Sequence, residues 1–176
     1  MLDDQLAADV ITTRLAEARR TTGVARGERL EEALALGCSQ VPGWRVRDTR
    51  LRTENEELDI VVANSSARAP WNGSAYVLFE AKNWSTNVDR AEYDSFHMKV
   101  VERGGACRIG FFVAAAGFSS GFYKRAEHFG TQGVSIVPMS VPWLEGRVRD
   151  EGIEPALTQS VERVVLDRTW EEEGFK

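Results

Sequence analysis

The run of residues 107–115 constrains the fold more than any other segment, because it is almost continuously apolar. Its sequence is Cys-Arg-Ile-Gly-Phe-Phe-Val-Ala-Ala. A strand with one solvated face would alternate apolar and polar residues, whereas a continuous apolar run is typical of a central strand covered on both faces. Such a strand requires helices on both sides of its sheet, so the sequence predicts an α/β fold.

Other segments complete the predicted order of elements. Short runs of branched and aromatic residues predict strands at 44–52, 57–63, 75–82 and 134–137, the last ending before Pro138. Apolar residues at helical spacing predict helices at 2–20, 24–36, 88–103, 119–129 and 155–170. The second helix is expected to end at Gly37, the third to begin near Thr86 or Asn87, and residues 64–74 to form a loop. This order predicts a mixed central sheet flanked by helices, with extra N- and C-terminal helices.

Composition places the chain among ordinary globular proteins. Its 176 residues are 43% hydrophobic and 28% charged, enough for one domain with a full core. The first residues are acidic and no apolar run approaches the roughly 20 residues that cross a bilayer, so a cytoplasmic location and no membrane partner are expected. Cys38 and Cys107 stand alone, which favours two buried free thiols over a zinc site.

The negative charge is concentrated near the C-terminus. Residues 142–176 carry nine acidic and five basic side chains, a net charge of −4 within a total of −5, which leaves −1 for residues 1–141. This near-neutral body argues against indiscriminate binding to duplex DNA by charge alone. The predicted division is an N-terminal helical extension at 1–22, a main domain at 23–141, and an acidic, helical C-terminal extension at 142–176.

A charged pair ends the predicted strand 75–82. Side chains alternate between the two faces of a strand, so Glu80 and Lys82 share a face with Tyr76 and Leu78. A charged pair is costly to bury unless it is paired or binds a metal. A lone Glu-x-Lys is more often a solvent-exposed edge pair, so further residues are needed to distinguish these readings.

Two more carboxylates supply that distinction. Asp59 interrupts the apolar strand 57–63, and if this strand neighbours 75–82, Asp59 comes within reach of Glu80. Two close carboxylates repel, and a divalent cation between them removes the repulsion; oxygen ligands suit Mg²⁺ or Mn²⁺. At 100° per residue, Glu31 is the glutamate of the second helix that faces the sheet, where it could bind a second metal or a metal-bound water.

The order of these motifs resembles the PD-(D/E)xK nuclease superfamily, in particular its Mrr-like restriction endonuclease branch. The resemblance covers about residues 24–138 and rests on the following segments: Gly27-x-x-Leu30-Glu31, Leu58-Asp59-Ile60-Val61-Val62, Phe79-Glu80-Ala81-Lys82-Asn83-Trp84, and Gly110-Phe111-Phe112-Val113 followed by Gly117-Phe118-Ser119 and Ala126. Leu58 stands where the motif has proline, which contributes no ligand. The DNA-reading domain that many Mrr-like proteins carry has no counterpart in residues 1–22.

The resemblance implies a restriction-endonuclease-like core, a role for each site residue, and an activity. Asp59, Glu80 and the carbonyl of Ala81 would bind Mg²⁺, with Mn²⁺ able to substitute. Lys82 would be the catalytic lysine and Glu31 the helix glutamate. The implied activity is that of a metal-dependent endodeoxyribonuclease, a hydrolase acting in restriction or antiviral defence, with DNA and a homodimer partner. Targeting would then depend on a separate defence-system protein.

Candidate DNA contacts are less distinctive than the catalytic set. Arg45 and Arg47 share a strand face that could follow a phosphate backbone, or they could form a solvated face balanced by nearby glutamates. Arg68 and Trp71 in the loop could enter a groove, although an ordinary exposed hairpin explains them as well. Trp84 is expected to pack rather than to stack on bases.

Two other functions remain open. A non-catalytic nucleic-acid-binding or assembly subunit could retain this fold, although carboxylates inside apolar strands count against it. A repair or junction-resolving nuclease would use the same site on another DNA structure. The spacing of Arg90 and His97 resembles that of some helical ribonucleases, but the chain is rich in strands and the match is best explained as coincidence.

Overall fold

The computed structural model describes residues 4–23, 25–129 and 133–168. The strands are β1 (Trp44–Arg52), β2 (Glu57–Asn64), β3 (Tyr76–Lys82), β4 (Cys107–Ala114) and β5 (Ser135–Ser140). The helices are α1 (Asp4–Arg20), α2 (Ala25–Cys38), α3 (Arg90–Val101), α4 (Ser120–Phe129), α5 (Val141–Glu151) and α6 (Ile153–Val165). The predicted α/β class is confirmed, as are the predicted strands 44–52, 57–63, 75–82 and 107–115 to within about one residue.

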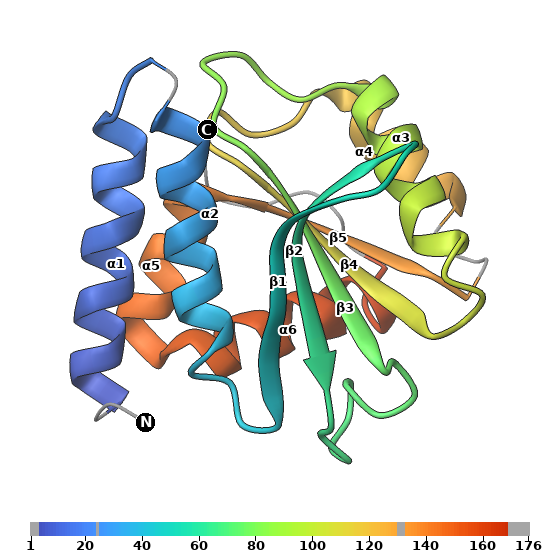
Figure 1. Ribbon diagram of the computed structural model, residues 1–176, viewed down its shortest axis with the longest axis horizontal. Helices are drawn as coiled ribbons and strands as arrows, with labels where there is room; N and C mark the ends of the chain where they lie inside the picture. Colours follow the sequence, from blue (N-terminus) through green and yellow to red (C-terminus); the bar gives the residue numbers. More distant parts are fainter. Residues whose placement is uncertain (1–3, 24, 130–132, 169–176) are drawn as a thin grey trace.

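The five strands form one mixed sheet in the order β1-β2-β3-β4-β5. The pairs β1–β2 and β2–β3 are antiparallel, whereas β3–β4 and β4–β5 are parallel. Figure 1 shows α1, α2, α5 and α6 on one side of the sheet and α3 and α4 on the other. α3 connects β3 to β4, and α4 connects β4 to β5, so both helices join parallel strands. Because helices lie on both sides of the sheet, β3 and β4 are covered on both faces.

Aromatic side chains fill the core on both faces of the sheet. On one face the cluster consists of Trp44, Trp71, Phe79 and Phe111. On the other it consists of Tyr93, Phe96, Phe112, Phe118 and Phe122. Cys38 and Cys107 are buried free thiols, as predicted. In the part of the chain that the structure describes, no helix is long and apolar enough to cross a membrane.

The predicted end of α2 is two residues too early, because Gly37 does not close the helix. α2 does not end at Gly37 but continues to Cys38. A Cβ atom on Gly37 would lie 3.4 Å from Cδ1 and Cγ1 of Ile153. A Cβ atom at that distance would be in van der Waals contact, and Gly37 is not among the residues with positive φ, so it continues the helix and does not end it.

The N-terminus of α3 also differs from the prediction. The helix begins at Arg90, and its N-cap is Asp89, whose side chain accepts a hydrogen bond from the Ala91 N–H. Neither Thr86 nor Asn87 is the cap. An aspartate in this position satisfies one of the otherwise unpaired N–H groups of the first turn.

β5 continues past Pro138, where the sequence predicted its end. Pro138 pairs with Phe112 of β4 inside the strand. Proline has no N–H group to donate, but β5 is the edge of the sheet and pairs with β4 alone. An edge strand tolerates proline because one side of its backbone makes no ladder hydrogen bonds.

The C-terminal segment holds two helices where the sequence predicted one. α5 was missed, although its start carries a recognisable signal: the side chain of Ser140 accepts a hydrogen bond from Trp143 N, and Pro142 lies in the first turn. The predicted helix 155–170 corresponds to α6, which begins two residues earlier and ends at Val165; residues 169 and 170 lie outside the described residues. α1 packs against α2 and α5, and the division at residues 22 and 141 stays a prediction.

Candidate active site

The antiparallel pairing of β2 and β3 ends beside Asp59. The last paired residues are Ile60 and Phe79, and the same register places Asp59 next to Glu80 on one face of the sheet. Oδ2 of Asp59 accepts a hydrogen bond from the Ala81 N–H at 2.8 Å. The strand neighbourhood on which the site prediction depended is therefore present, and it brings Asp59 to the end of β3.

Glu80 lies between two lysines. Its Oε1 accepts a hydrogen bond from Lys82 Nζ at 2.6 Å, and its Oε2 accepts one from Lys99 Nζ at 2.8 Å. The Glu80 side chain is only 6% exposed, so this carboxylate is buried in an ion-paired form. The shared face of Glu80 and Lys82 follows the strand parity, but the edge-pair interpretation does not hold because the glutamate is covered.

Lys99 is one site residue that sequence reasoning missed. It projects from α3, which lies close to the sheet because β4 carries Gly110 beneath it. A Cβ atom on Gly110 would lie 2.9 Å from Phe96 Cε1 and 2.9 Å from Val100 Cγ2. A side chain at this position would push α3 away, so the glycine is what allows Lys99 to reach Glu80. The helical spacing of Phe96 and Val100 indicated a buried face of this helix. It did not show which strand this face packs against.

Burial and charge act on Asp59 and Lys82 in opposite directions. Burial, and then the neighbouring Glu80 carboxylate, raise the pKa of Asp59 to about 6. Burial alone would lower the pKa of Lys82, but attraction to Glu80 outweighs it and the pKa is raised overall. In this arrangement Lys82 is an ammonium ion at neutral pH, which suits charge balance and hydrogen-bond donation better than proton abstraction.

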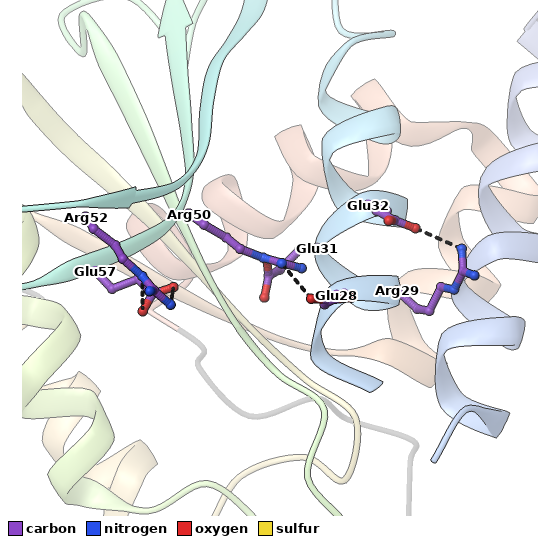
Figure 2. A network of polar contacts seen from close by, with 7 residues as sticks. All are labelled: Glu28, Arg29, Glu31, Glu32, Arg50, Arg52 and Glu57. Atoms are coloured by element: carbon purple, nitrogen blue, oxygen red, sulfur yellow. Dashed lines mark hydrogen bonds and ion pairs between the residues drawn. The ribbon is translucent and has the colours of Figure 1, made fainter. Parts of the chain in front are cut away.

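Glu31 faces the same site, as the helix geometry predicted, but it is paired. Figure 2 shows Arg50 of β1 between Glu31 and Glu28 of α2. Arg50 Nε donates to Glu31 Oε2 at 2.6 Å, and Arg50 Nη1 donates to Glu28 Oε1 at 2.8 Å. Glu32 lies apart from them and pairs with Arg29 at 3.1 Å on the outer surface of α2.

Asn83 positions α2 beside the end of β3. Its side chain is buried, and Nδ2 donates to the carbonyl oxygens of Ala18 at 2.8 Å and Arg26 at 2.7 Å. Arg26 Nε donates in return to Asn83 Oδ1 at 3.1 Å. These bonds tie the end of α1 and the start of α2 to the strand that carries Glu80 and Lys82, and so fix the side of the site that contains Glu31.

A pocket of about 570 Å³ opens between these elements. Its lining residues come from the α1–α2 connection, α2, β2, and β3 with the segment after it: Gly23, Arg26, Gly27, Glu31, Glu57, Asp59, Ala81, Lys82, Asn83, Trp84, Ser85 and Thr86. Trp84 is 43% exposed, and Lys82 Nζ lies 5.7 Å from the centre of its ring. Trp84 is therefore not part of the buried core, and its role in packing or in base stacking stays a prediction.

The oxygen donors around the pocket suit a hard divalent cation. Among the described residues, Asp59 Oδ1 makes no hydrogen bond, and no three His, Cys, Asp or Glu side chains form a metal cluster. A cation here would use Asp59 and the Ala81 carbonyl, with Glu80 available only if a lysine moves aside and with water completing the shell. Mg²⁺ prefers oxygen donors and keeps several of its waters. A bound cation would also stabilise the ionised form of Asp59, whose pKa is raised by burial and by repulsion from Glu80.

The candidate DNA contacts fall into two groups. Arg45 and Arg47 are exposed on β1, with the Arg47 guanidinium 5.9 Å from the Tyr76 ring centre. Arg45 pairs with Ala63, four residues along β2 from Asp59, a separation of about 13 Å at the usual rise of a strand.

The two loop residues differ from each other. Arg68 is exposed, and its guanidinium lies 3.8 Å from Glu154. Trp71 is 1% exposed and packs against Trp44 at 4.8 Å between ring centres. The suggestion that Trp71 enters a groove is therefore wrong, because the loop folds its indole into the core.

His97 has a structural environment. It is buried on α3 and stacks on Tyr93 with 5.8 Å between ring centres. Burial lowers the pKa of His97, and the residue is outside the pocket lining. This agrees with the interpretation of the Arg90 and His97 spacing as coincidence.

Comparison with known proteins adds no family to this description. No protein-family model matches the sequence, and no curated protein matches it either.

Proposed function

We propose that this chain is a Mg²⁺-dependent endonuclease of the PD-(D/E)xK type that hydrolyses phosphodiester bonds in DNA. One observation carries the proposal: Asp59, Lys82 and Glu31 line a single pocket, and Glu80 lies directly against Lys82. These four residues come from three elements, α2, β2 and β3. An incidental surface pair would not bring residues from separate elements to one partly buried place.

The side chains divide the chemistry between them. Bound Mg²⁺ would polarise the scissile phosphate and activate a water molecule. Asp59 and the Ala81 carbonyl would hold the cation, and Lys82, as an ammonium ion, would donate to a phosphate oxygen or orient the water. Glu80 would keep Lys82 in place through the 2.6 Å hydrogen bond, and Asn83 would hold the α2 side of the pocket.

The wider role follows from the family resemblance. It implies DNA as substrate, products with 5′-phosphate ends, and a place in restriction or antiviral defence, with a homodimer cutting both strands. The exposed Arg45 and Arg47 would contact the phosphate backbone beyond the cleaved bond. A separate protein would supply targeting, and Mn²⁺ would substitute for Mg²⁺. A repair or junction-resolving nuclease would use the same residues on another DNA structure.

A non-catalytic nucleic-acid-binding subunit is the rival that one observation favours. Both oxygens of Glu80 accept hydrogen bonds from lysines, so the carboxylate is already neutralised without a metal. In a binding subunit this arrangement would persist, whereas in a nuclease that also uses Glu80 as a ligand one lysine would yield when the cation binds.

Plasmid nicking separates the two functions. We expect cleavage by the wild-type chain with Mg²⁺ or Mn²⁺ and none with EDTA, and losses of at least about 100-fold, or about 2.7 kcal/mol in the barrier, for Asp59→Ala and Lys82→Ala. Asp150→Ala and Lys124→Ala, which change exposed residues of the same types, serve as matched controls. Equal activity in all variants would refute the site; DNA binding without cleavage by the wild type would favour the binding subunit.

A further inference from the structure

Arg50 has a backbone conformation that few residues adopt. Its φ angle is +58°, within the left-handed region that L residues with side chains rarely enter. It lies inside β1, between the pairs Thr49–Ile60 and Leu51–Leu58. A residue keeps such a conformation in a strand only where its surroundings determine it strongly, and this kind of outlier is concentrated at functional sites.

The Arg50 side chain bridges two glutamates of α2. Its guanidinium donates to Glu31, whose side chain is 15% exposed, and to Glu28. The next arginine along the strand offers a comparison: Arg52 pairs with Glu57 at 3.3 Å, but both side chains are well exposed and Arg52 is not among the residues with positive φ. Figure 2 shows the two arginines side by side, one on Glu28 and Glu31 of α2 and the other on Glu57 of its own hairpin, which also lines the pocket.

Two of the carboxylates at the pocket are therefore already paired with basic side chains of the protein. Glu80 is held by Lys82 and Lys99, and Glu31 is held by Arg50. Asp59 is the remaining carboxylate of the predicted set, and among the described residues its Oδ1 makes no hydrogen bond. A first divalent cation has this oxygen to bind, but a second one at Glu31 would have to displace a guanidinium fixed by two short hydrogen bonds.

We propose that Arg50 is a positioning residue that occupies Glu31 in place of a second divalent cation, so that the site binds one cation. This inference rests on the proposed function, because it concerns the same pocket. Arg50 binds Oε2 of Glu31 and bridges this carboxylate to Glu28. Guanidinium is suited to this place because it is always charged and its planar donors reach two carboxylates at once.

Counting bound Mn²⁺ on the protein alone tests the inference, by electron paramagnetic resonance of the free ion or by calorimetry. The main variant is Arg50→Gly, which removes the guanidinium and accepts the positive φ without strain. We expect one bound Mn²⁺ in the wild type and two in Arg50→Gly. Arg50→Lys, which keeps a cation, should return the count to one, and so should Arg50→Gly combined with Glu31→Gln.

Arg29→Gln is the matched control, because it removes a positive charge from the outer surface of α2 without touching the pocket. It should leave the count at one. Two ions in the wild type, or one in Arg50→Gly, would overturn the role of Arg50 and leave the proposed function standing. No bound Mn²⁺ in any of the proteins would overturn the cation site itself, and with it both proposals.

Discussion

The two ends of β3 are stabilised in different ways. From its start to its centre, Val77 and Phe79 are buried, and the Phe79 and Phe111 rings stack with centres 4.7 Å apart. At its last residues, Glu80 and Lys82 pair with each other at 2.6 Å. One strand of seven residues therefore passes from a close-packed apolar core to a buried ion pair.

This difference shows which end of β3 stabilises the fold and which end loses stability by holding the candidate site. Burial of aromatic side chains is strongly favourable, whereas buried charges lose hydration that their partners restore only in part. The packing around Phe79 holds the strand in place. The charged groups from Glu80 onward do not stabilise the fold, so their place in the strand points to a function. Mutations at the two ends are therefore expected to affect stability and activity differently.

The largest effect on stability is expected from the aromatic end. Trp71→Ala removes a side chain that is 1% exposed and lies 4.8 Å from Trp44 between ring centres. We expect the free energy of unfolding to fall by about 3–5 kcal/mol, as is usual for a large buried aromatic residue. Urea denaturation measures the loss, and nicking activity at a temperature where the variant is still folded should remain close to wild type.

Trp84→Ala is the matched control for this experiment, because Trp84 is 43% exposed and lines the pocket. It should change stability by less than about 1 kcal/mol while weakening activity. If Trp71→Ala abolished DNA binding without loss of stability, Trp71 would belong to the DNA-binding surface and the contrast between the two ends of β3 would be wrong.

A smaller loss is expected when Glu80 loses one of its lysines. Lys99→Met keeps the aliphatic length of the side chain but leaves Oε2 of Glu80 without its 2.8 Å donor. Removal of one partner of a buried pair usually costs about 3–5 kcal/mol. Because Lys82 still binds the other oxygen, we expect the lower end of that range, about 3 kcal/mol, in urea denaturation.

The double variant Lys99→Met with Glu80→Gln gives the decisive comparison. It removes the charge that Lys99 compensates, so most of the lost stability should return. If the double variant were as unstable as Lys99→Met, the loss would come from the packing of the lysine stem on α3, and Glu80 would not depend on two cations.

The sequence was sufficient for the parts of the site that depend on one element. Strand parity placed Glu80 and Lys82 on one face, and helix geometry selected Glu31 from three glutamates of α2. Both rules act within a few residues and need no knowledge of the neighbouring element. The α/β class followed from the apolar run 107–115, for the same reason.

The parts that could not be predicted depend on contacts between distant elements. Lys99 reaches Glu80 only because Gly110 of β4 brings α3 close, and Arg50 reaches Glu31 from a strand edge. Trp71 was placed in an exposed loop by its polar neighbours, but its backbone is held by Asn64, whose Nδ2 donates to the Trp71 carbonyl at 2.8 Å. In each case a residue far along the chain, or a loop with its own hydrogen bonds, decides where the side chain lies.

The smallest of these effects is a gain in stability at the charged end. Burial and Glu80 raise the pKa of Asp59 to about 6, above the value of about 3.9 in an unfolded chain. The folded state therefore binds this proton more tightly, and the stability it contributes is complete below about pH 4 and is lost as the pH rises through 6. Asp59→Asn removes this dependence, so at pH 7.5 the variant should be about 2 kcal/mol more stable than the wild type.

Urea denaturation of both proteins at pH 4 and pH 7.5 measures this gain. Near pH 4 the two should be about equally stable, because Asp59 is then largely protonated, and an asparagine oxygen can still accept the hydrogen bond from the Ala81 N–H. Asp150→Asn, at an exposed position, should show no such gain at either pH. Cleavage should be lost in Asp59→Asn although its fold is firmer, because the carboxylate that destabilises the protein is the one proposed to hold the cation. If Asp59→Asn were less stable than the wild type at pH 7.5, Asp59 would contribute to folding, and the charged end of β3 would be part of the structural core.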